Sequence, residues 1–213
     1  MSPYGPSSSA GALRQGEILS EVIQAHISID YLRSITEEPE IEEKFHPQAI
    51  VLSQDCDLYW DFTARNELEG QRRLEHKIMP NVLFGELIPE EDLRGKLRES
   101  RMGSDIWRRV VRNMDERYHY LPQIRPEEDR AGQGLSALVV DFKRVFAILT
   151  EELYIRLQGG TRWRTCIQGP FLQHLSSRFG YYCLRVALPE PKQNTAISSP
   201  GAALPEPAQR EPK

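Results

Sequence analysis

Residues 47–58, PQAIVLSQDCDL, constrain the fold more than any other stretch of this chain. Four consecutive apolar residues, 49–52, lie between Pro47 and a polar cluster that begins at Ser53. A short, unbroken apolar run with such boundaries is typical of a strand that is covered on both faces. The sequence therefore predicts a buried strand here. The acids that follow it are either a reactive site or the polar end of that strand.

The composition is that of a globular domain with two polar ends. Of the 213 residues, 39% are hydrophobic and 27% are charged, as in soluble folded domains. Residues 1–12 are rich in Ser, Gly and Pro, and residues 189–213 are rich in Pro with almost no large apolar side chain. Such segments cannot bury enough surface to offset the entropy lost on ordering. We expect one domain over 13–188 with a helical insertion at about 89–114, between a disordered N-terminus and a disordered tail.

Charge and cysteine content exclude several classes of protein. The formal net charge is −4, so nucleic-acid binding would need a local basic face. Three cysteines, an odd number, fit neither a disulfide framework nor paired metal knuckles. No apolar stretch is long enough to span a membrane, and the N-terminus lacks the pattern of a secretory signal. We expect a cytoplasmic protein with reduced thiols, no cofactor, no metal ion and no membrane contact.

Periodicity predicts a strand-rich body with two inserted helices and a closing helix. Residues 89–100 and 104–112 have helical spacing, with acids or a capping serine at their start. A helix that buries one stripe is predicted after Pro170, from the row Phe171, Leu175, Phe179 and Cys183. Strands are expected at 17–19, 49–53, 76–84, 117–124, 135–142 and 144–149. The segment after residue 19 could be strand or helix. A charged loop is expected at 36–47, and a tight polar step at 143–144 separates the last two strands. This order indicates an α+β domain built on a small barrel.

Three stretches carry a resemblance to a known fold family. They are RQGEILSEV (14–22), HPQAIVLSQDCD (46–57) and LSALVVDFKRVFAI (135–148), the last followed by the helix after Pro170. Together they resemble the opening, buried and late strands of the MazF/PemK-like toxin fold, a small SH3-like barrel that ends in a helix. The resemblance implies a toxin-like or defence-associated module, as in toxin–antitoxin or phage-defence systems. Such a module would contact RNA, DNA or a protein partner such as an antidote, and barrels of this type are often homodimers.

The same resemblance implies a second candidate function, that of a metal-independent endoribonuclease. Family members that cut RNA carry an arginine two residues before an aspartate on the late strand. Here Asp141 holds the place of the aspartate, and Val139 holds that of the arginine. The preceding strand offers Arg117 and His119, which with Asp141 could supply the cation, base and acid of the reaction, provided that the three side chains converge in one cleft. The simpler interpretation is an amphipathic strand whose arginine and histidine face solvent.

Three interpretations are open for the polar triplet after the buried strand, Asp55, Cys56 and Asp57. Cys56 could be the nucleophile of a cysteine hydrolase with His119 or His76 brought close by folding, although flanking carboxylates disfavour its thiolate. The two aspartates could bind a hard cation together with Asp61. The favoured interpretation is a structural corner, in which the two aspartates accept hydrogen bonds from backbone donors in the turn after the strand and the cysteine packs as a small apolar residue.

The densest positive region lies in and around the second inserted helix. Its arginines are followed by aromatic residues on the next strand, and the residues expected to bind are Arg108, Arg109, Arg112, Tyr118 and Tyr120. Phosphate attraction combined with base stacking is the basis of sequence-tolerant binding to single strands. Arginines opposite an apolar stripe are also found on any exposed helix. From the sequence, a binding module is therefore the favoured function, with the endoribonuclease and the cysteine hydrolase as alternatives.

Overall fold

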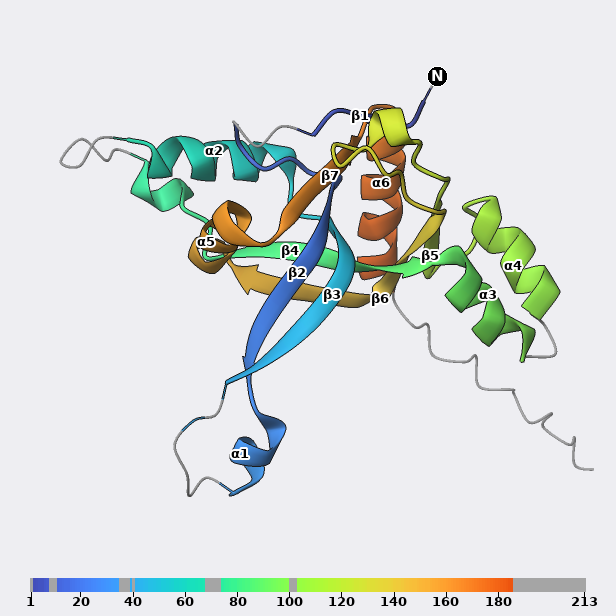
Figure 1. The fold of residues 1–213 in the computed structure, drawn as a ribbon, viewed down its shortest axis with the longest axis horizontal. Coiled ribbons are helices and arrows are strands. Elements are labelled where there is room, and N and C mark those ends of the chain that lie inside the picture. Colours follow the sequence, from blue (N-terminus) through green and yellow to red (C-terminus); the bar gives the residue numbers. More distant parts are fainter. Residues whose placement is uncertain are drawn as a thin grey trace, which may run out of the picture.

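A single antiparallel sheet organises the chain. The computed structural model describes residues 2–7, 11–34, 39, 41–67, 74–99 and 103–185. Within them, seven strands are hydrogen-bonded in the order β1-β7-β2-β3-β4-β6-β5 (Figure 1). The strands are β1 (Tyr4–Gly5), β2 (Glu17–Ile27), β3 (Ile41–Val51), β4 (Asn81–Pro89), β5 (Tyr118–Leu121), β6 (Leu138–Leu149) and β7 (Arg162–Ile167).

Helices cover the sheet and extend from its ends (Figure 1). The α-helices of the described residues are α1 (Ile29–Ser34), α2 (Asp55–Arg65), α3 (Glu90–Arg98), α4 (Gly103–Val111), α5 (Thr150–Gly159) and α6 (Phe171–Cys183), and two short 3-10 helices are η1 (Glu75–Lys77) and η2 (Pro126–Glu128). The pair α3–α4 is the helical insertion expected from the sequence, and α6 is the expected closing helix. In the part of the chain that the structure describes, no helix combines the length and apolarity needed to cross a membrane.

The sheet is open. The α+β class is confirmed, but a closed SH3-like barrel is not, because β1 and β5 are the two ends of the strand order. Other contacts hold these edges near each other. The Tyr4 hydroxyl in β1 donates to the carbonyl oxygen of Pro122, just after β5, at 2.6 Å. The amide of Arg130, between β5 and β6, donates to the carbonyl oxygen of Arg164 in β7 at 2.7 Å.

β4 lies between the two segments that the sequence places in the core. β3 pairs with β4 at Ile50 and Gly85, and β6 pairs with β4 at Val140 and Leu87. The buried strand and the strand around Val140 are therefore one strand apart. A Cβ atom on Gly85 would lie 3.0 Å from Val140 Cγ1 and 3.3 Å from Ile50 Cγ2, so the missing side chain lets both neighbours close over β4.

Both faces of the sheet are covered, as the apolar run at 49–52 predicts. On one face, Ile50 packs in a cluster that includes Leu175 of α6. On the other face, Val51 packs in a cluster that includes Leu58 of α2 and Leu153 of α5. A third cluster joins the α3–α4 insertion to β5 and β6.

Several sequence predictions are wrong in extent. The charged loop expected at 36–47 is a strand from Ile41 onward, because β3 stays in register with β2 as far as Ile27. The polar step at 143–144 lies within β6 and does not end the strand, although the pairing of β6 with β4 shifts register between Val140 and Val145. Residues 4 and 5, expected to be disordered, pair with β7, and the tail at 189–213 lies outside the described residues. Helices α1, α2 and α5 and strand β7 were not predicted.

β2 and β3 extend beyond the sheet as an arm, which we define as residues 21–34 and 41–47. β7 pairs only with residues 17–20 of β2, and β4 pairs only with residues 49–51 of β3. The rest of the two strands forms a two-stranded ribbon. Glu21, where the ribbon begins, has a φ of +59°, a left-handed conformation that is uncommon for a residue with a side chain. Figure 1 shows the arm projecting from the sheet, with α1 at its tip.

Gly85→Ala tests the close approach of three strands at β4. The added methyl group would have to displace Val140, Ile50 and Leu52, all of which lie within 3.3 Å of its position. Overpacking of this kind costs about 1–3 kcal/mol. We expect urea denaturation to show a loss of that size in the free energy of unfolding.

Gly95→Ala is the matched control, because a Cβ atom there meets nothing within 4 Å. Gly95 is exposed in the middle of α3, where alanine is favoured over glycine by about 0.5–1 kcal/mol. The control should therefore be stabilised by that amount. An unchanged stability in Gly85→Ala would contradict the packing described for β4.

Candidate functional site

The candidate site is a pocket of about 580 Å³ between the start of α2, the segment before β2 and the end of β7, here called the α2 pocket. Its lining residues come from four parts of the chain that the fold brings together: Pro6, Gly11, Ala12, Arg14, Glu17, Asp55, Cys56, Tyr59, Trp60, Cys166 and Gln168. The volume falls in the range of ligand pockets, roughly 300–1,000 Å³. The pocket combines a cation, carboxyl groups, thiols and two aromatic rings.

Asp55 connects α2 to the beginning of β2. Arg14 donates to it in a bidentate arrangement, with Nε at 2.8 Å from Oδ1 and Nη2 at 2.7 Å from Oδ2. The amide of Gln15 donates to Oδ1 at 2.9 Å. Burial would raise the pKa of Asp55, but the hydrogen bonds from Arg14 and Gln15 outweigh burial and lower it. Asp55 therefore remains ionised and fixes the pocket wall. The backbone donor is Gln15, from the segment before β2, and not a donor in the turn after β3 as the corner interpretation expects.

Glu17 is a buried carboxyl group at the inner side of the pocket. It is 1% exposed, and the hydroxyl of Ser7 donates to it. Burial raises the pKa of Glu17 to about 7, against the smaller lowering effect of the Ser7 hydrogen bond. Burial also raises the pKa of the neighbouring Cys166 thiol to about 12, and the charge of Glu17 adds to that shift. Near neutral pH, Glu17 can therefore be either a donor or an acceptor, whereas Cys166 stays a thiol.

Cys56 is exposed in this pocket and does not pack as the small apolar residue expected from the sequence. Its Sγ atom lies 3.7 Å from Gln54 Oε1 and 3.7 Å from Asp57 Oδ1. No histidine is among the residues that line the pocket, so the imidazole that a cysteine hydrolase requires is missing from the described surroundings. The polar triplet is the first turn of α2 rather than a corner. Acids in a first turn complement the helix dipole.

Two aromatic side chains form the outer rim of the α2 pocket. Tyr59 is 57% exposed and Trp60 is 40% exposed, and their rings meet edge to face with centroids 5.6 Å apart. The Lys77 ammonium group lies 5.7 Å from the Trp60 ring centroid. The two rings therefore present adjacent aromatic surface to solvent at the rim of the pocket.

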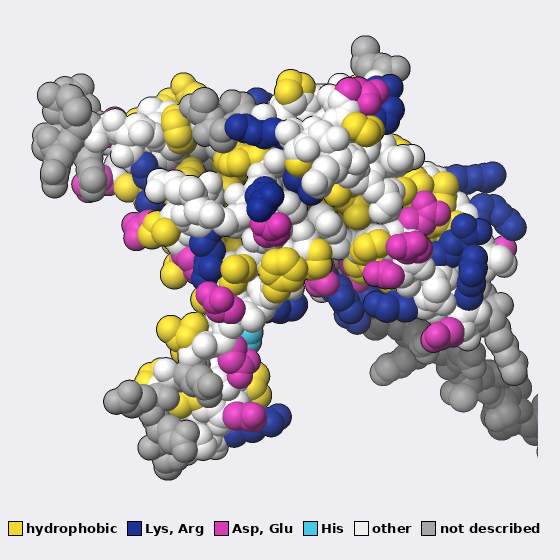
Figure 2. Space-filling model, in the orientation of Figure 1, with side chains coloured by type: hydrophobic (Ala, Val, Ile, Leu, Met, Phe, Trp, Pro, Cys, Tyr) yellow, Lys and Arg dark blue, Asp and Glu magenta, His cyan; other side chains and the backbone are white. Residues whose placement is uncertain are grey.

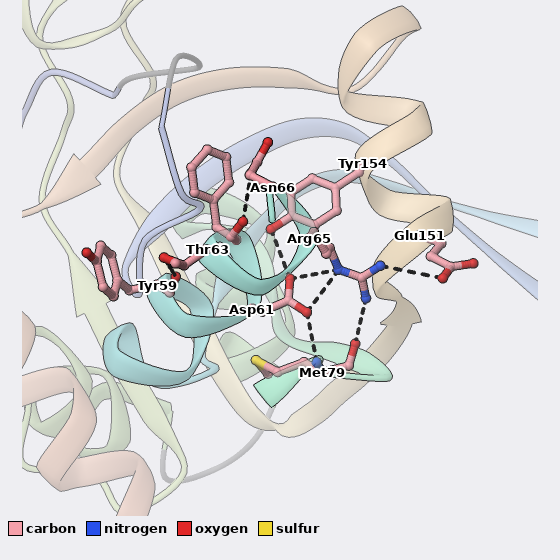
Figure 3. A network of polar contacts seen from close by, with 9 residues as sticks. Tyr59, Asp61, Thr63, Arg65, Asn66, Met79, Glu151 and Tyr154 are labelled. Carbon is pink, nitrogen blue, oxygen red and sulfur yellow. Dashed lines mark hydrogen bonds and ion pairs between the residues drawn. The ribbon is translucent and has the colours of Figure 1, made fainter. Parts of the chain in front are cut away.

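A buried polar network holds α2 against α5 (Figure 3). Asp61 accepts hydrogen bonds from Arg65 Nε at 2.9 Å, from the amide of Met79 at 2.8 Å and from the Tyr154 hydroxyl at 3.2 Å. Arg65 also donates to the carbonyl oxygen of Met79 at 3.1 Å. Burial raises the pKa of Tyr154 to about 12, and the charge of Asp61 adds to the rise. Asp61 is thus a structural anchor. In the described ranges, no cluster of three metal-ligating side chains occurs.

The three residues of the endoribonuclease hypothesis do not converge. Arg117 donates to Asp141 through Nε at 2.7 Å and through Nη2 at 2.6 Å. Asp141 lies opposite Tyr118, whereas His119 lies opposite Val140, so the histidine and the aspartate are on different faces of the sheet. The expected arginine–aspartate pair is therefore present, and the expected base is not beside it.

His119 is buried, contrary to the expectation that it faces solvent. Its ring lies between Phe142 and His174, with centroids 6.2 Å and 5.4 Å away. Burial lowers the pKa of His119 to about 3, and the charges of Arg178 and His174 contribute. The imidazole therefore remains neutral inside the sheet–α6 interface.

The α4 arginines are exposed as predicted, but their aromatic neighbours are not free to stack. Arg108 and Arg109 pair with Asp105 and Asp115 at 3.4 Å and 4.0 Å, and Arg112 is exposed. Figure 2 shows basic and acidic side chains interleaved over α3 and α4. Tyr118 is buried in the cluster beneath the insertion, and the Tyr120 hydroxyl donates to Glu90 Oε2 at 3.0 Å. This surface offers charge without a stacking platform.

Sequence reasoning missed most of the α2 pocket, although it singled out Asp55 and Cys56. Tyr59 and Trp60 follow Cys56 by three and four residues, which places them on the same side of a helix. Recognition of α2 would have brought these rings to the polar triplet. Arg14 and Glu17 reach the pocket only through the pairing of β2 with β3 and β7, which no local pattern reveals.

Glu17 makes stability depend on pH. Its pKa in the folded protein is raised from 4.5 to about 7, so the folded state holds a proton that the unfolded state releases between these values. The stabilisation is complete below pH 4.5 and is lost as the pH rises through about 7. The loss is on the order of 3 kcal/mol. We expect Glu17→Gln to remove this decline when urea denaturation is followed from about pH 5 to about pH 8.

The exposed Glu91 of α3 supplies the control for that measurement. Glu91→Gln should retain the decline of the unmodified protein. A decline that persists in Glu17→Gln would show that another group is responsible.

The Asp61 network predicts two losses of different size. Asp61→Ala leaves the partly buried Arg65 and the Met79 amide without their acceptor, which costs about 3–5 kcal/mol for a broken buried pair. Tyr154→Phe removes one hydrogen bond, worth about 1 kcal/mol. We expect thermal and urea denaturation to rank the variants in this order. Equal losses would contradict the central position of Asp61.

Comparisons with known proteins assign no relative to this chain. No family model, no curated protein and no solved structure matches it.

Proposed function

We propose that this protein is a binding module for single-stranded nucleic acid that takes an unpaired base into the α2 pocket. The observation that carries the proposal is the exposed ring pair of Tyr59 and Trp60 beside Arg14 and Glu17 in one pocket. Unpaired bases are recognised by stacking on aromatic side chains and by hydrogen bonds to their edges. The α2 pocket offers both kinds of group within one concave surface.

Stacking supplies the sequence-independent part of the affinity. A base that lies on Tyr59 or Trp60 would cover ring surface that is now exposed. Base–aromatic stacking contributes about 1–3 kcal/mol per base. The Lys77 ammonium near the Trp60 ring provides positive charge for the phosphates that flank the base, whereas the charge of Arg14 is already paired with Asp55. A local basic contact is what a chain of formal charge −4 needs for this function.

Hydrogen-bonding groups behind the rim would read the edge of the base. Gln168 carries both a donor and an acceptor and is exposed in the pocket. Glu17 can donate when protonated and accept when ionised, and its pKa of about 7 makes both states accessible near neutral pH. A mixed donor–acceptor set of this kind suits the polar edges of nucleobases better than a purely apolar ligand.

The toxin-like or defence-associated role is part of the same proposal, and it is supported only by the three sequence stretches that resemble the MazF/PemK-like fold. The antiparallel sheet, with its edges held near each other by Tyr4 and Pro122, is compatible with an opened relative of the SH3-like barrel. Of the two enzymatic alternatives, the endoribonuclease has Arg117 and Asp141 together but His119 on the other face. The cysteine hydrolase has an exposed Cys56 but no histidine in its pocket.

Fluorescence anisotropy with a labelled single-stranded RNA tests the proposal. We expect binding that weakens with added salt, because phosphate contacts release counterions. Trp60→Ala should weaken it roughly 5- to 100-fold through the loss of stacking. Tyr181→Ala removes another exposed aromatic ring, on α6 and outside the pocket lining, and should leave the affinity unchanged.

The same samples separate the alternatives when the RNA is run on a denaturing gel. Intact RNA with reduced binding by Trp60→Ala supports the binding module. Cleavage that His119→Ala abolishes and Trp60→Ala does not would favour the endoribonuclease instead. Equal affinities for Trp60→Ala and Tyr181→Ala would refute base binding in the α2 pocket.

A further inference from the structure

The arm has one apolar face that nothing in the described part of the chain covers at its outer end. Ile23 lies opposite Phe45, Ala25 lies opposite Glu43, and Ile27 lies opposite Ile41. Residues directly opposite each other in an antiparallel pair share a face, as do residues two apart on a strand. Five of these six side chains are apolar, and we call this surface the apolar arm face: Ile23, Ala25, Ile27, Ile41 and Phe45.

The other face of the ribbon is polar. It carries Gln24 opposite Lys44 and His26 opposite Glu42, and His26 pairs with Glu42 at 3.2 Å. Apart from Glu43, apolar and polar residues alternate along both strands, which is the pattern of a sheet with one face in water and one face against another layer. The arm therefore has the sequence of a covered ribbon.

Coverage within the protomer reaches only the root of the apolar arm face. Ile23 and Phe45 border a hollow whose other wall is the end of α5. Phe45 is nevertheless 58% exposed, and farther out Ile27 and Ile41 are 48% and 68% exposed. α1 adds the exposed side chains of Ile29 and Leu32 at the tip. Figure 2 shows apolar side chains on the projecting arm, away from the body of the molecule.

Among the described residues of the arm, the charged side chains on and beside this face are paired. Glu43 is the one charged residue among the six opposed positions, and Arg156 of α5 pairs with it at 2.8 Å. At the root, Glu21 pairs with Arg162 at 3.0 Å, and at the tip Asp30 pairs with Arg33 at 3.3 Å. A nucleic acid or a strongly charged peptide would gain no electrostatic attraction here. A neutral apolar surface is the complementary occupant.

We infer that the apolar arm face is the contact between two copies of this chain, packed face to face about a two-fold axis. An isologous interface must be complementary to itself, which a neutral apolar ribbon satisfies without a second sequence. The exposed side chains of the face and of α1 present on the order of 500 Å² of apolar surface. Two copies would cover on the order of 1,000 Å², about where specific interfaces begin.

The pairing also explains the length of the arm. A two-stranded ribbon with both edges unpaired is at best marginally stable in water, yet β2 and β3 continue in register to Ile27 and Ile41. A second ribbon packed against the first makes a four-stranded, two-layer unit with a dry interior. This inference concerns a surface away from the α2 pocket and does not depend on the proposed function.

Sedimentation equilibrium of the full chain measures the mass directly. We expect the unmodified protein to have twice the mass of one chain. A variant with Ile41→Lys and Phe45→Lys should have the mass of a single chain, because each copy would place two ammonium groups in an apolar contact. Ile155→Lys is the matched control, since Ile155 is 70% exposed on α5 and outside the apolar arm face, and it should stay dimeric.

A charge-reversed partner keeps the test independent of any folding defect. The variant with Ile41→Glu and Phe45→Glu should also be monomeric, and an equimolar mixture with the lysine variant should restore the double mass. A monomeric unmodified protein would overturn the inference. So would a lysine variant that remains dimeric, or a mixture of the two variants that stays monomeric while circular dichroism shows both to be folded.

Discussion

The close approach of β3 and β6 across β4 is the constraint on which the rest of the structure depends. Ile50 and Val140 meet over a position without a side chain at Gly85. Because β4 connects the N-terminal hairpin to the C-terminal strands, this contact joins both halves of the sheet. It also lets α6 pack on one face and α2 with α5 on the other. The α2 pocket lies on the β1-β7-β2 side of this contact, since its walls come from the segments around β1, β2 and β7 and from the start of α2.

The α2 pocket is held by contacts of two kinds. Asp61 fixes the middle of α2 to α5 and to the segment before β4, while Asp55 fixes its first turn to the start of β2. With both ends fixed, Tyr59 and Trp60 are presented on a rigid helix rather than on a loop. A rigid aromatic rim loses little conformational freedom when a planar ligand stacks on it. The same anchoring explains why the polar triplet is a part of the pocket wall without being a nucleophilic centre.

The sequence was informative where local pattern and tertiary structure agree. The apolar run at 49–52, the insertion around α3 and α4, and the helix after Pro170 were predicted because their periodicity is imposed by burial. The strand at residues 41–47 was not predicted, because Glu42, Glu43 and Lys44 are exposed and take their conformation from pairing with β2. The step at 143–144 coincides with a register shift between β6 and β4, from Val140 opposite Leu87 to Val145 opposite Gly85, but β6 continues through it as one strand.

The residues of the candidate site were likewise predicted only in part from the sequence. Asp55 and Cys56 were recognised from chemistry alone. A meeting of Arg117 with Asp141 was considered only within the endoribonuclease hypothesis, whereas the simpler interpretation had Arg117 facing solvent; the two side chains are paired. The buried position of His119 was not predicted. Whether a histidine on a strand faces solvent or packs against a helix depends on what covers that face of the sheet, and here α6 covers it. Glu17 could not have been singled out, because its unusual environment arises from Ser7, ten residues earlier, and from Cys166, far along the chain.

The short lengths of the two edge strands affect the tendency of the protein to aggregate. β1 has two residues and β5 has four, so each of these two edge strands offers only a short row of unpaired amides and carbonyls to a foreign peptide. Short edge strands resist the edge-to-edge pairing with other chains that leads to aggregation. Self-association by backbone templating is thereby suppressed at β1 and β5, whereas residues 145–149 of β6, which pair with β4, extend past the end of β5.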